Sequence, residues 1–529
     1  MIDMLRGSLL WRVFYGLYVA LCNSCLARFS AKWKAGWRSS VAVALLGRIF
    51  TSQPTATQNS GTARRLSAIN RRLHRMGQTF VPMLQNSLLY RIYGCIFTAG
   101  RNSRVFGKLF DGGLTTFFLL TVGLYAAIDF LLRDVLAVPV VSSTWDEALL
   151  LLAVVWIVYD RIRTITPLEN KMTPMDMPMF LFVMAGFGLM FLVSPFFSIA
   201  VSGYRATVQY MLWFFLGTRL VRNEKDFMTL YLTLVGLAFL ISLHGIYQYI
   251  VAAPIPENWT DQAEQSVRTR VYSIFGSPNI MGNYMVMFAP MAAGLAYYVK
   301  GWKAKAAFWF VTLCMCLSCL FTMSRGAWAA MALAIVIFAL LVDRRLFLLM
   351  LAAGIVACFL PFVASRLGYL FTEEYAASTA NGGRNSRWEL ALEYLHMMSP
   401  VWGVGLGMFG GAIAMQHKIY AWVSYFYVDN YYLKIMVEMG YFGFAVFLFM
   451  MVSAITTGLR SVARTAKTKY YSLCAGMLSG LSGVLLHCYT ENIFEEPYMM
   501  VYFWSIVALL VFAGFTIHKT TTDRKDVSQ

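Results

Sequence analysis

Residues 227–252 read FMTLYLTLVGLAFLISLHGIYQYIVA and contain no Asp, Glu, Lys or Arg. A helix needs about 20 consecutive apolar residues to cross the hydrocarbon core of a bilayer. A helix also satisfies its own backbone hydrogen bonds, which lipid cannot do for it. This segment therefore predicts a transmembrane helix.

The same apolar character extends over most of the 529 residues, of which 59% are hydrophobic and only 13% charged. No run of alternating polarity suggests the strands of a membrane barrel. We therefore predict an all-α, polytopic integral membrane protein of about twelve transmembrane helices. The expected spans are Leu114–Leu132, Trp145–Tyr159, Pro178–Val201, Ala206–Val221, Phe227–Ala252, Ile280–Val299, Ala306–Met323, Gly326–Val342, Leu346–Val363, Met439–Thr456, Ser472–Tyr489 and Met499–Ile517.

The placement of the 44 Lys and Arg residues orients these helices. Basic residues in short loops stay in the cytoplasm, and most of those in this chain fall on one side if both termini are cytoplasmic. A smaller set is expected at or beyond the outer face and calls for an explanation. Its members are Arg133, Arg205, Arg268, Arg270, Arg325, Arg366, Arg384, Arg387, Lys418 and Lys434.

Residues 1–113 form a separate basic module that holds most of the chain's net charge of +18. We expect short amphipathic helices here, lying on the anionic lipids of the inner leaflet, because such lipids attract basic residues. Residues 53–62 are typical of a flexible linker. Serine is a favoured N-cap, and the expected caps are Ser8, Ser24, Ser40, Ser87 and Ser103.

The membrane domain is expected at 114–517, with a cytoplasmic tail at 518–529. Two of its outer loops are long, 254–278 and 365–428, and the second exceeds what a connector requires. The nine cysteines show no metal-ligand spacing, so we predict no metal site. The chemistry is expected on the outer face.

Two groups of outer residues break the apolar pattern. Arg268 and Arg270 precede Pro278 and Asn279, and a proline there suits the first turn of a helix. Arg325 lies between two spans that are tightly joined. An ionisable residue at this depth is either functional or an interfacial anchor.

A third group follows at Arg384 and Arg387, which open an expected helix. The glycines at 403, 405 and 407 then permit tight turns or a close backbone approach, and are weak evidence for phosphate binding. Several arginines on one membrane face suit a multiply charged anion, because guanidinium groups bind phosphate oxygens in a bidentate fork. The implied ligand is a lipid diphosphate.

Five motifs occur in a fixed order along the chain. They are Arg270 with Ser277-Pro278-Asn279, Ser324-Arg325-Gly326, Gly383-Arg384 with Trp388, Pro400 with Gly403, Gly405, Gly407 and Phe409, and Asp429-Asn430 with Leu433, Glu438, Gly440 and Gly443. In this order they resemble the O-antigen ligase and polysaccharide polymerase superfamily of bacterial envelope glycosyltransferases. The resemblance covers most of residues 114–517 and none of residues 1–113.

This resemblance implies a multi-pass protein of the bacterial cytoplasmic membrane with twelve helices. It implies transfer of a glycan from an undecaprenyl diphosphate carrier to a glycan or lipid acceptor hydroxyl outside the cytoplasm, without a cofactor or nucleic-acid partner. The resemblance alone does not distinguish between a polymerase, a lipid A core ligase and a protein O-oligosaccharyltransferase. Arg270, Arg325 and Arg384 would hold the diphosphate, since fixed positive charge stabilises negative charge that develops in a transition state.

Asp429 stands where the ligase branch usually has a His before Asn430, and this departure favours the polymerase branch. Its carboxylate is expected to act as general base, to orient the sugar or to cap a helix. Glu438 is expected to support structure, and Glu491 either binds acceptor hydroxyls or is a solvated charge. In this scheme the catalytic residues are Asp429, Arg384 and Arg325, and the substrate-binding residues are Arg268, Arg270, Asn279, Arg387, Asn430 and Glu491.

Two other classes compete with a transferase. A twelve-helix secondary transporter usually has two similar halves and substrate-site interruptions near the midplane, and neither pattern is visible here. A non-catalytic membrane scaffold is disfavoured by the outer arginines. The sequence therefore favours a glycosyltransferase.

Overall fold

The computed structural model describes residues 61–103, 107, 113–163, 172–255, 269–373, 376–377, 383–418 and 427–517. The chain divides into two compact units, residues 1–79 with 165–172, and the remainder. The helices expected after Ser8, Ser24 and Ser40, the tail at 518–529 and most of the segment after Ser103 lie outside the described residues.

Two helices are described in the basic region. α6 (Gly61–Gln85) begins inside the expected linker, so the last two residues of that linker are helical instead. α7 (Leu88–Arg101) begins where expected, because the Ser87 hydroxyl accepts a hydrogen bond from the Tyr90 backbone amide over 3.2 Å. The N-cap predicted at Ser87 is therefore confirmed.

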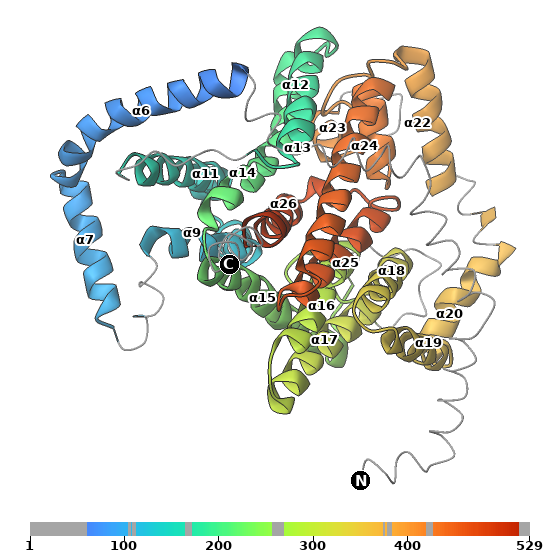
Figure 1. Ribbon diagram of the computed structural model, residues 1–529. Helices are drawn as coiled ribbons and strands as arrows, with labels where there is room; N and C mark the ends of the chain where they lie inside the picture. Colours follow the sequence, from blue (N-terminus) through green and yellow to red (C-terminus); the bar gives the residue numbers. More distant parts are fainter. Residues whose placement is uncertain are drawn as a thin grey trace, which may run out of the picture. The chain divides into compact units, whose positions relative to one another are not determined.

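The described residues of the second unit are helical and contain no strand, in agreement with the predicted all-α class (Figure 1). The principal helices are α9 (Gly113–Gly123), α10 (Tyr125–Phe130), α11 (Pro139–Ile162), α12 (Asp176–Leu192), α13 (Phe197–Val208), α14 (Leu212–Leu220), α15 (Glu224–Ile250), α16 (Pro278–Tyr298), α17 (Trp302–Phe321), α18 (Arg325–Leu341), α19 (Arg345–Cys358), α20 (Pro361–Gly368), α22 (Arg384–Met398), α23 (Ala412–His417), α24 (Tyr431–Thr465), α25 (Tyr471–His487) and α26 (Pro497–Val511).

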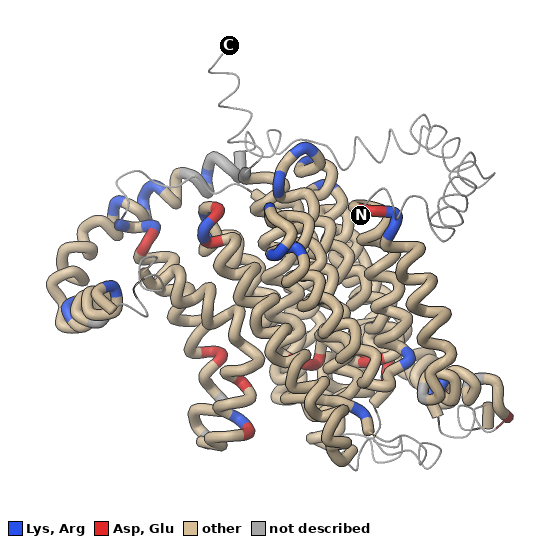
Figure 2. Tube along the Cα trace, turned by 90° about the horizontal axis from the view of Figure 1, so that it is seen from below, with Lys and Arg blue, Asp and Glu red and all other residues tan. Residues whose placement is uncertain are grey.

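Five helices in the described part of the chain are long and apolar enough to cross a membrane. A sixth is added if the pair Gly113–Gly123 and Tyr125–Val135, bent by 72°, counts as one broken span. The five are Glu224–Ile250, Pro278–Tyr298, Trp302–Phe321, Tyr431–Thr465 and Pro497–Thr516. Charged residues of this unit gather mainly near the helix ends (Figure 2), as expected for helices whose middles face lipid or each other.

Four of the twelve expected spans are interrupted. The span expected at Leu114–Leu132 bends by 72° between α9 and α10, and a 3₁₀ turn at Gln209–Met211 divides the span expected at Ala206–Val221. The other two are interrupted at prolines. The span expected at Pro178–Val201 is divided, because α12 ends at Leu192 and α13 begins only at Phe197, beyond Pro195. The span expected at Leu346–Val363 is divided in the same way before Pro361, which starts α20. Proline lacks a backbone N–H and disfavours helical geometry in the residue before it, so a helix ends there.

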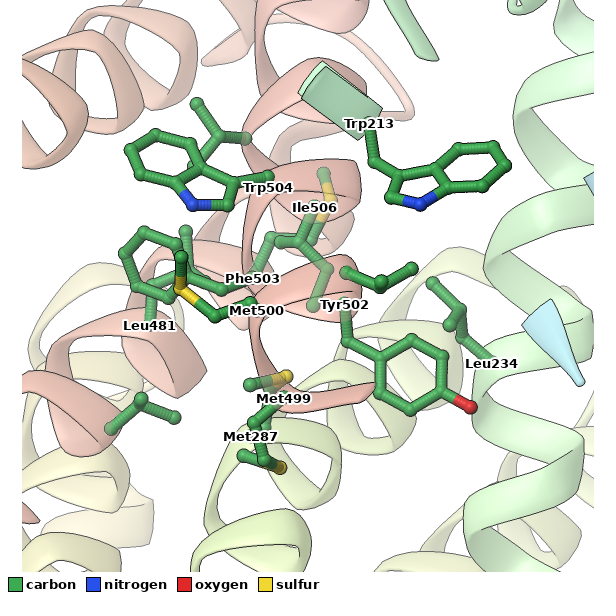
Figure 3. Close-up of a cluster of buried hydrophobic side chains, with 14 of the residues drawn as sticks. Trp213, Leu234, Met287, Leu481, Met499, Met500, Tyr502, Phe503, Trp504 and Ile506 are labelled. Carbon is green, nitrogen blue, oxygen red and sulfur yellow. The ribbon is translucent and has the colours of Figure 1, made fainter. Parts of the chain in front are cut away.

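The core of the second unit surrounds α26, nearly all of whose residues are buried. Figure 3 shows α26 side chains such as Tyr502 and Trp504 among residues of four other helices. The neighbouring helices α14, α15, α16 and α25 supply Trp213, Leu234, Met287 and Leu481. The packing around α26 therefore helps to position α16 and α25.

α16 and α25 pack closely through small residues. A Cβ at Gly480 would lie 2.2 Å from the Met287 carbonyl oxygen, and one at Gly476 would lie 2.4 Å from the Pro290 carbonyl oxygen. Small residues of this kind let helix backbones approach in membrane proteins. The start of α16 and the end of α25 are therefore fixed relative to each other.

α24 is broken at Gly440, where φ is 66° and ψ is −177°. The glycine-rich loop, residues 400–411, packs against this break, and its glycines 403, 405, 407 and 410 all have positive φ. Backbone groups that the break leaves without helical partners are thereby satisfied. The four bonds run from Val404 N to Val437 O (3.0 Å), from Gly405 N to Glu438 O (2.9 Å), from Tyr441 N to Pro400 O (2.9 Å) and from Phe442 N to Val401 O (3.2 Å).

Candidate active site

A cavity of about 270 Å³ lies where the N-termini of α16, α18 and α22 meet the C-terminal end of α25. Four of its lining side chains are arginines, and none of the Asp and Glu residues that the structure describes lines it. The lining residues are Arg270, Asn279, Met323, Ser324, Arg325, Gly326, Arg366, Arg384, His487 and Thr490.

Local sequence explains why two of the helices begin here. Ser277 caps α16 by accepting from the Ile280 amide, and Pro278 occupies the first turn as predicted. Ser324 caps α18 by accepting from the Ala327 amide over 3.4 Å. A helix N-terminus presents N–H groups and a partial positive charge, so each one favours an anion. The three helix N-termini and the four guanidinium groups therefore all favour an anion in the cavity.

Arg270 is buried and held by two neighbours. Its Nε donates to the Thr322 carbonyl over 3.2 Å, and its Nη2 lies 3.5 Å from Asn279 Oδ1. The Thr322 contact ties this arginine to the turn that leads into α18. Arg270 is thereby oriented by two of the segments that form the cavity.

The other three arginines reach the cavity from different helices. Arg325 is the first residue of α18 and lies over the ring of Tyr369, 5.8 Å from its centroid. Arg366 lies on α20 and is only 6% exposed. Arg384 is the first residue of α22, and its Nε is buried without a hydrogen-bond partner in the described part of the chain. The predicted convergence of Arg270, Arg325 and Arg384 thus occurs in the structure.

Glu491 follows α25 and is 8% exposed, so its interpretation as a solvated charge is wrong. Its Oε2 accepts from Asn279 Nδ2 over 2.5 Å, which fixes the Asn279 amide with its oxygen toward Arg270. Burial raises the pKa of the Glu491 carboxyl to about 7, and the Asp429 carboxylate acts in the same direction. Glu491 therefore orients cavity residues from just behind the wall.

Asp429 is not among the cavity-lining residues. Its carboxylate pairs with Arg387, with Oδ2 2.8 Å from Nη1, and its φ of 50° is unusual for a residue other than glycine. Burial raises the pKa of Asp429, and Arg387 and Arg384 oppose that shift. The helix cap assigned to Asp429 is wrong by one residue, because Asn430 caps α24 by accepting from the Leu433 amide.

The glycine-rich loop packs around the carboxylate of Glu438. Glu438 is fully buried, accepts from the Phe409 amide over 3.3 Å and pairs with Lys434 at 2.8 Å. Lys434 also lies 3.5 Å from Glu495. The structural role predicted for Glu438 is confirmed, and the glycines serve the α24 break.

Four cavity residues lie outside the sequence motifs, namely Met323, Arg366, His487 and Thr490, and two of them have ionisable side chains. Arg366 belongs to the outer basic set but to none of the five motifs. His487 is an isolated titratable residue at the end of an apolar helix, a signal that could have identified it. Arg268 lies outside the described residues.

Residues 310–448 match the family model described as O-antigen ligase. This part of the chain is similar to the O-antigen ligase family. The resemblance drawn from the five motifs is therefore confirmed, and glycan transfer of the O-antigen ligase or polymerase type is supported at the level of the family. No curated protein matches the chain.

The matched residues extend from α17 into α24 and include Arg325, Arg366 and Arg384 of the cavity. The rest of the wall lies outside the matched residues and consists of Arg270, Asn279, His487 and Thr490. The apolar helices and the family match together indicate a multi-pass bacterial membrane protein.

Proposed function

We propose that the protein transfers a glycan from a polyprenyl diphosphate carrier to an acceptor hydroxyl on the extracytoplasmic side of the bacterial cytoplasmic membrane. The observation that carries the proposal is the convergence of four arginines and three helix N-termini on one cavity next to the region that matches the O-antigen ligase family. An undecaprenyl diphosphate is the donor that such a site suits. Its diphosphate is a multiply charged anion, and its lipid chain keeps it in the membrane.

The reaction is a substitution at the anomeric carbon of the donor sugar. The acceptor oxygen forms a bond to that carbon on one side, and the bond to the diphosphate oxygen breaks on the other. The electron pair leaves with the diphosphate, so the configuration is inverted. Arg325 and Arg384 lie in the cavity where this charge develops, and a fixed guanidinium group stabilises it without reorganising.

Other residues are assigned to orientation. Glu491 and Asn279 hold Arg270 through the contacts described above. Asp429, paired with Arg387 beside the start of α24, is assigned to the acceptor sugar. A carboxylate whose pKa is raised by burial suits hydrogen bonding to sugar hydroxyls.

The polymerase branch fits this chain better than the ligase branch. The residue before Asn430 is Asp429, whereas ligases usually have His there. In a polymerase the acceptor is itself a lipid-linked glycan.

The test uses the full chain in lipid nanodiscs, with lipid-linked oligosaccharide extracted from the producing bacterium as both donor and acceptor. Longer glycans should form in the presence of EDTA. Arg325→Ala and Arg384→Ala should each lower the rate by about 100-fold to 1,000-fold, as is typical for removal of one group that stabilises developing charge. Arg344→Ala, an exposed arginine outside the cavity, is the matched control.

Two results would contradict the proposal in different ways. If the native protein leaves the glycan length and the carrier unchanged, transfer from this donor is excluded. If transfer occurs and folded Arg325→Ala and Arg384→Ala proteins keep the native rate, the arginines do not hold the diphosphate.

A further inference from the structure

Among the described residues that line the cavity, His487 is the only one whose side chain has a basic nitrogen with a free lone pair; the other polar side chains are arginines, an amide and hydroxyls. It ends α25, is 2% exposed, and its Nδ1 has no hydrogen-bond partner in the described part of the chain. Buried polar atoms usually have partners, and an exception at a ligand cavity indicates a group kept for the ligand.

The position of His487 is set by its neighbours. The ring lies against Gly326 at the start of α18, where a Cβ would come within 2.9 Å of both Cδ2 and Nε2. The next residue, Cys488, accepts through its carbonyl from the Tyr431 amide over 2.9 Å. His487 is thus fixed between the turn that carries Arg325 and the segment that carries Asp429.

Asp429 is less suited to accept the proton. Its carboxylate is paired with Arg387 and does not line the cavity. A neutral imidazole beside several arginines, in contrast, keeps a lone pair available, since a further positive charge there is unfavourable. A bound diphosphate supplies negative charge that makes protonation of the ring favourable.

We propose, on the basis of the function proposed above, that His487 is a catalytic residue that accepts the proton of the acceptor hydroxyl. The O–H bond breaks and its proton moves to the imidazole as the oxygen bonds to the anomeric carbon. The electron pair of the sugar–oxygen bond leaves with the diphosphate. The imidazolium then returns its proton to the released diphosphate, so the ring is neutral again at the end of the cycle.

The charges that face the ring bear on its protonation. They come from the segment before α16, from α18, α20 and α22, and from the turn after α25. Four of these groups line the cavity together with His487, namely Arg270, Arg325, Arg366 and Arg384. Glu491 lies behind the cavity wall, and Asp429 is close to Arg384.

The experiment compares His487→Ala and His487→Gln with native protein in nanodiscs, using the extracted lipid-linked oligosaccharide and, separately, inorganic pyrophosphate. We expect kcat to fall by about 100-fold to 10,000-fold, the usual contribution of general base catalysis. Pyrophosphate affinity should change by less than about threefold, because the arginines remain. Added imidazole should restore part of the rate of His487→Ala but not of Arg384→Ala. His396→Gln, an exposed histidine of α22 outside the cavity, is the matched control.

A second variant tests position without removing the ring. Gly326→Ala adds a Cβ that would lie 2.7 Å from Thr490 Oγ1 and 2.9 Å from the His487 ring, so the ring must move. We expect a lowered kcat with retained pyrophosphate binding.

Three outcomes separate the possibilities. If native protein transfers glycan and His487→Gln retains its kcat, the assignment of His487 is wrong while the proposed function stands. If imidazole fails to rescue His487→Ala that still binds pyrophosphate, the residue is not the base. If native protein shows no transfer, it is the proposed function that fails.

Discussion

The side-chain amide of Asn279 donates to the carboxylate of Glu491 over 2.5 Å and joins residues 212 positions apart in the chain. The contact closes one side of the arginine cavity, because Asn279 lines it and also faces Arg270. An acidic group thus lies directly behind a wall of cationic ones. The protonation of the Glu491 carboxyl should therefore affect the stability of the protein.

Glu491→Gln should change how stability depends on pH. The carboxyl has a pKa of about 7 in the folded protein and an ordinary value of 4.5. The folded state therefore binds the proton more tightly, so the stabilisation is complete below about pH 4.5 and is lost as pH rises through about 7. At pH 8 the glutamine variant, which still accepts from Asn279, should be more stable than native protein by up to roughly 3 kcal/mol.

Thermal unfolding of both proteins from pH 5 to pH 8.5 measures this difference. The gap in Tm should close as the pH falls below 7. A constant gap over the whole range would show that Glu491 does not titrate there.

Arg366→Ala should weaken pyrophosphate binding although no sequence motif includes Arg366. A charge-assisted hydrogen bond contributes about 1.5–3 kcal/mol, which corresponds to about a 10-fold to 100-fold loss of affinity. Isothermal titration in nanodiscs measures it, with exposed Arg344→Ala as the control. Unchanged affinity in Arg366→Ala, together with a loss in Arg384→Ala, would remove Arg366 from the anion site.

Gly440→Ala should destabilise the fold. The residue has a φ of 66°, and a Cβ there would lie 2.2 Å from the Val401 carbonyl oxygen. The variant must disrupt the contact between the α24 break and the glycine-rich loop, so we expect a loss of several kcal/mol, more than about 3.

Gly236→Ala in α15 is the matched control, because a Cβ there meets nothing within 4 Å. Alanine favours a helix interior over glycine by about 0.5–1 kcal/mol, so this variant should be at least as stable as native protein. The measurement is the Tm of the purified proteins. Equal Tm values for the two variants would contradict the structural account of the break.

The orientation predicted from basic residues can be tested by cysteine labelling. Gln416 on α23 and Lys467 after α24 are both exposed and lie on opposite sides in the predicted topology. An impermeant maleimide added to intact spheroplasts should label Gln416→Cys and not Lys467→Cys. The reverse pattern would invert the topology. Both labelling cysteines are introduced into a protein in which four native cysteines are replaced by Ser. These are the exposed Cys95 and Cys358 and the N-terminal Cys22 and Cys25.

Helix positions were largely predictable, because apolar runs report the environment of each segment directly. The helix at 227–252 and the start of α16 at Pro278 depend on local chemistry alone. The breaks before Pro195 and Pro361 do not follow from hydropathy, because they arise from the missing N–H of proline and not from a change in polarity. A proline inside an apolar run can therefore end a helix even where the hydropathy stays high.

The site was partly predictable for a related reason. Arg325 and Arg384 stand out because they contradict the positive-inside pattern, which is a one-dimensional signal. The burial of Glu491 depends on Asn279, far away in sequence, and no local pattern reports such a contact. His487 was missed because one polar residue hardly alters the apolar character of α25.

The arginine-lined cavity lowers the stability of the folded protein. Four guanidinium groups from α18, α20, α22 and the segment before α16 share about 270 Å³ and repel one another, aided by three helix N-termini. Like charges held this close destabilise a compact state. The residues that prepare the site for an anion therefore oppose folding, a trade-off between activity and stability. Evolution toward greater thermal tolerance would tend to neutralise these arginines, and only selection for their chemistry would retain them.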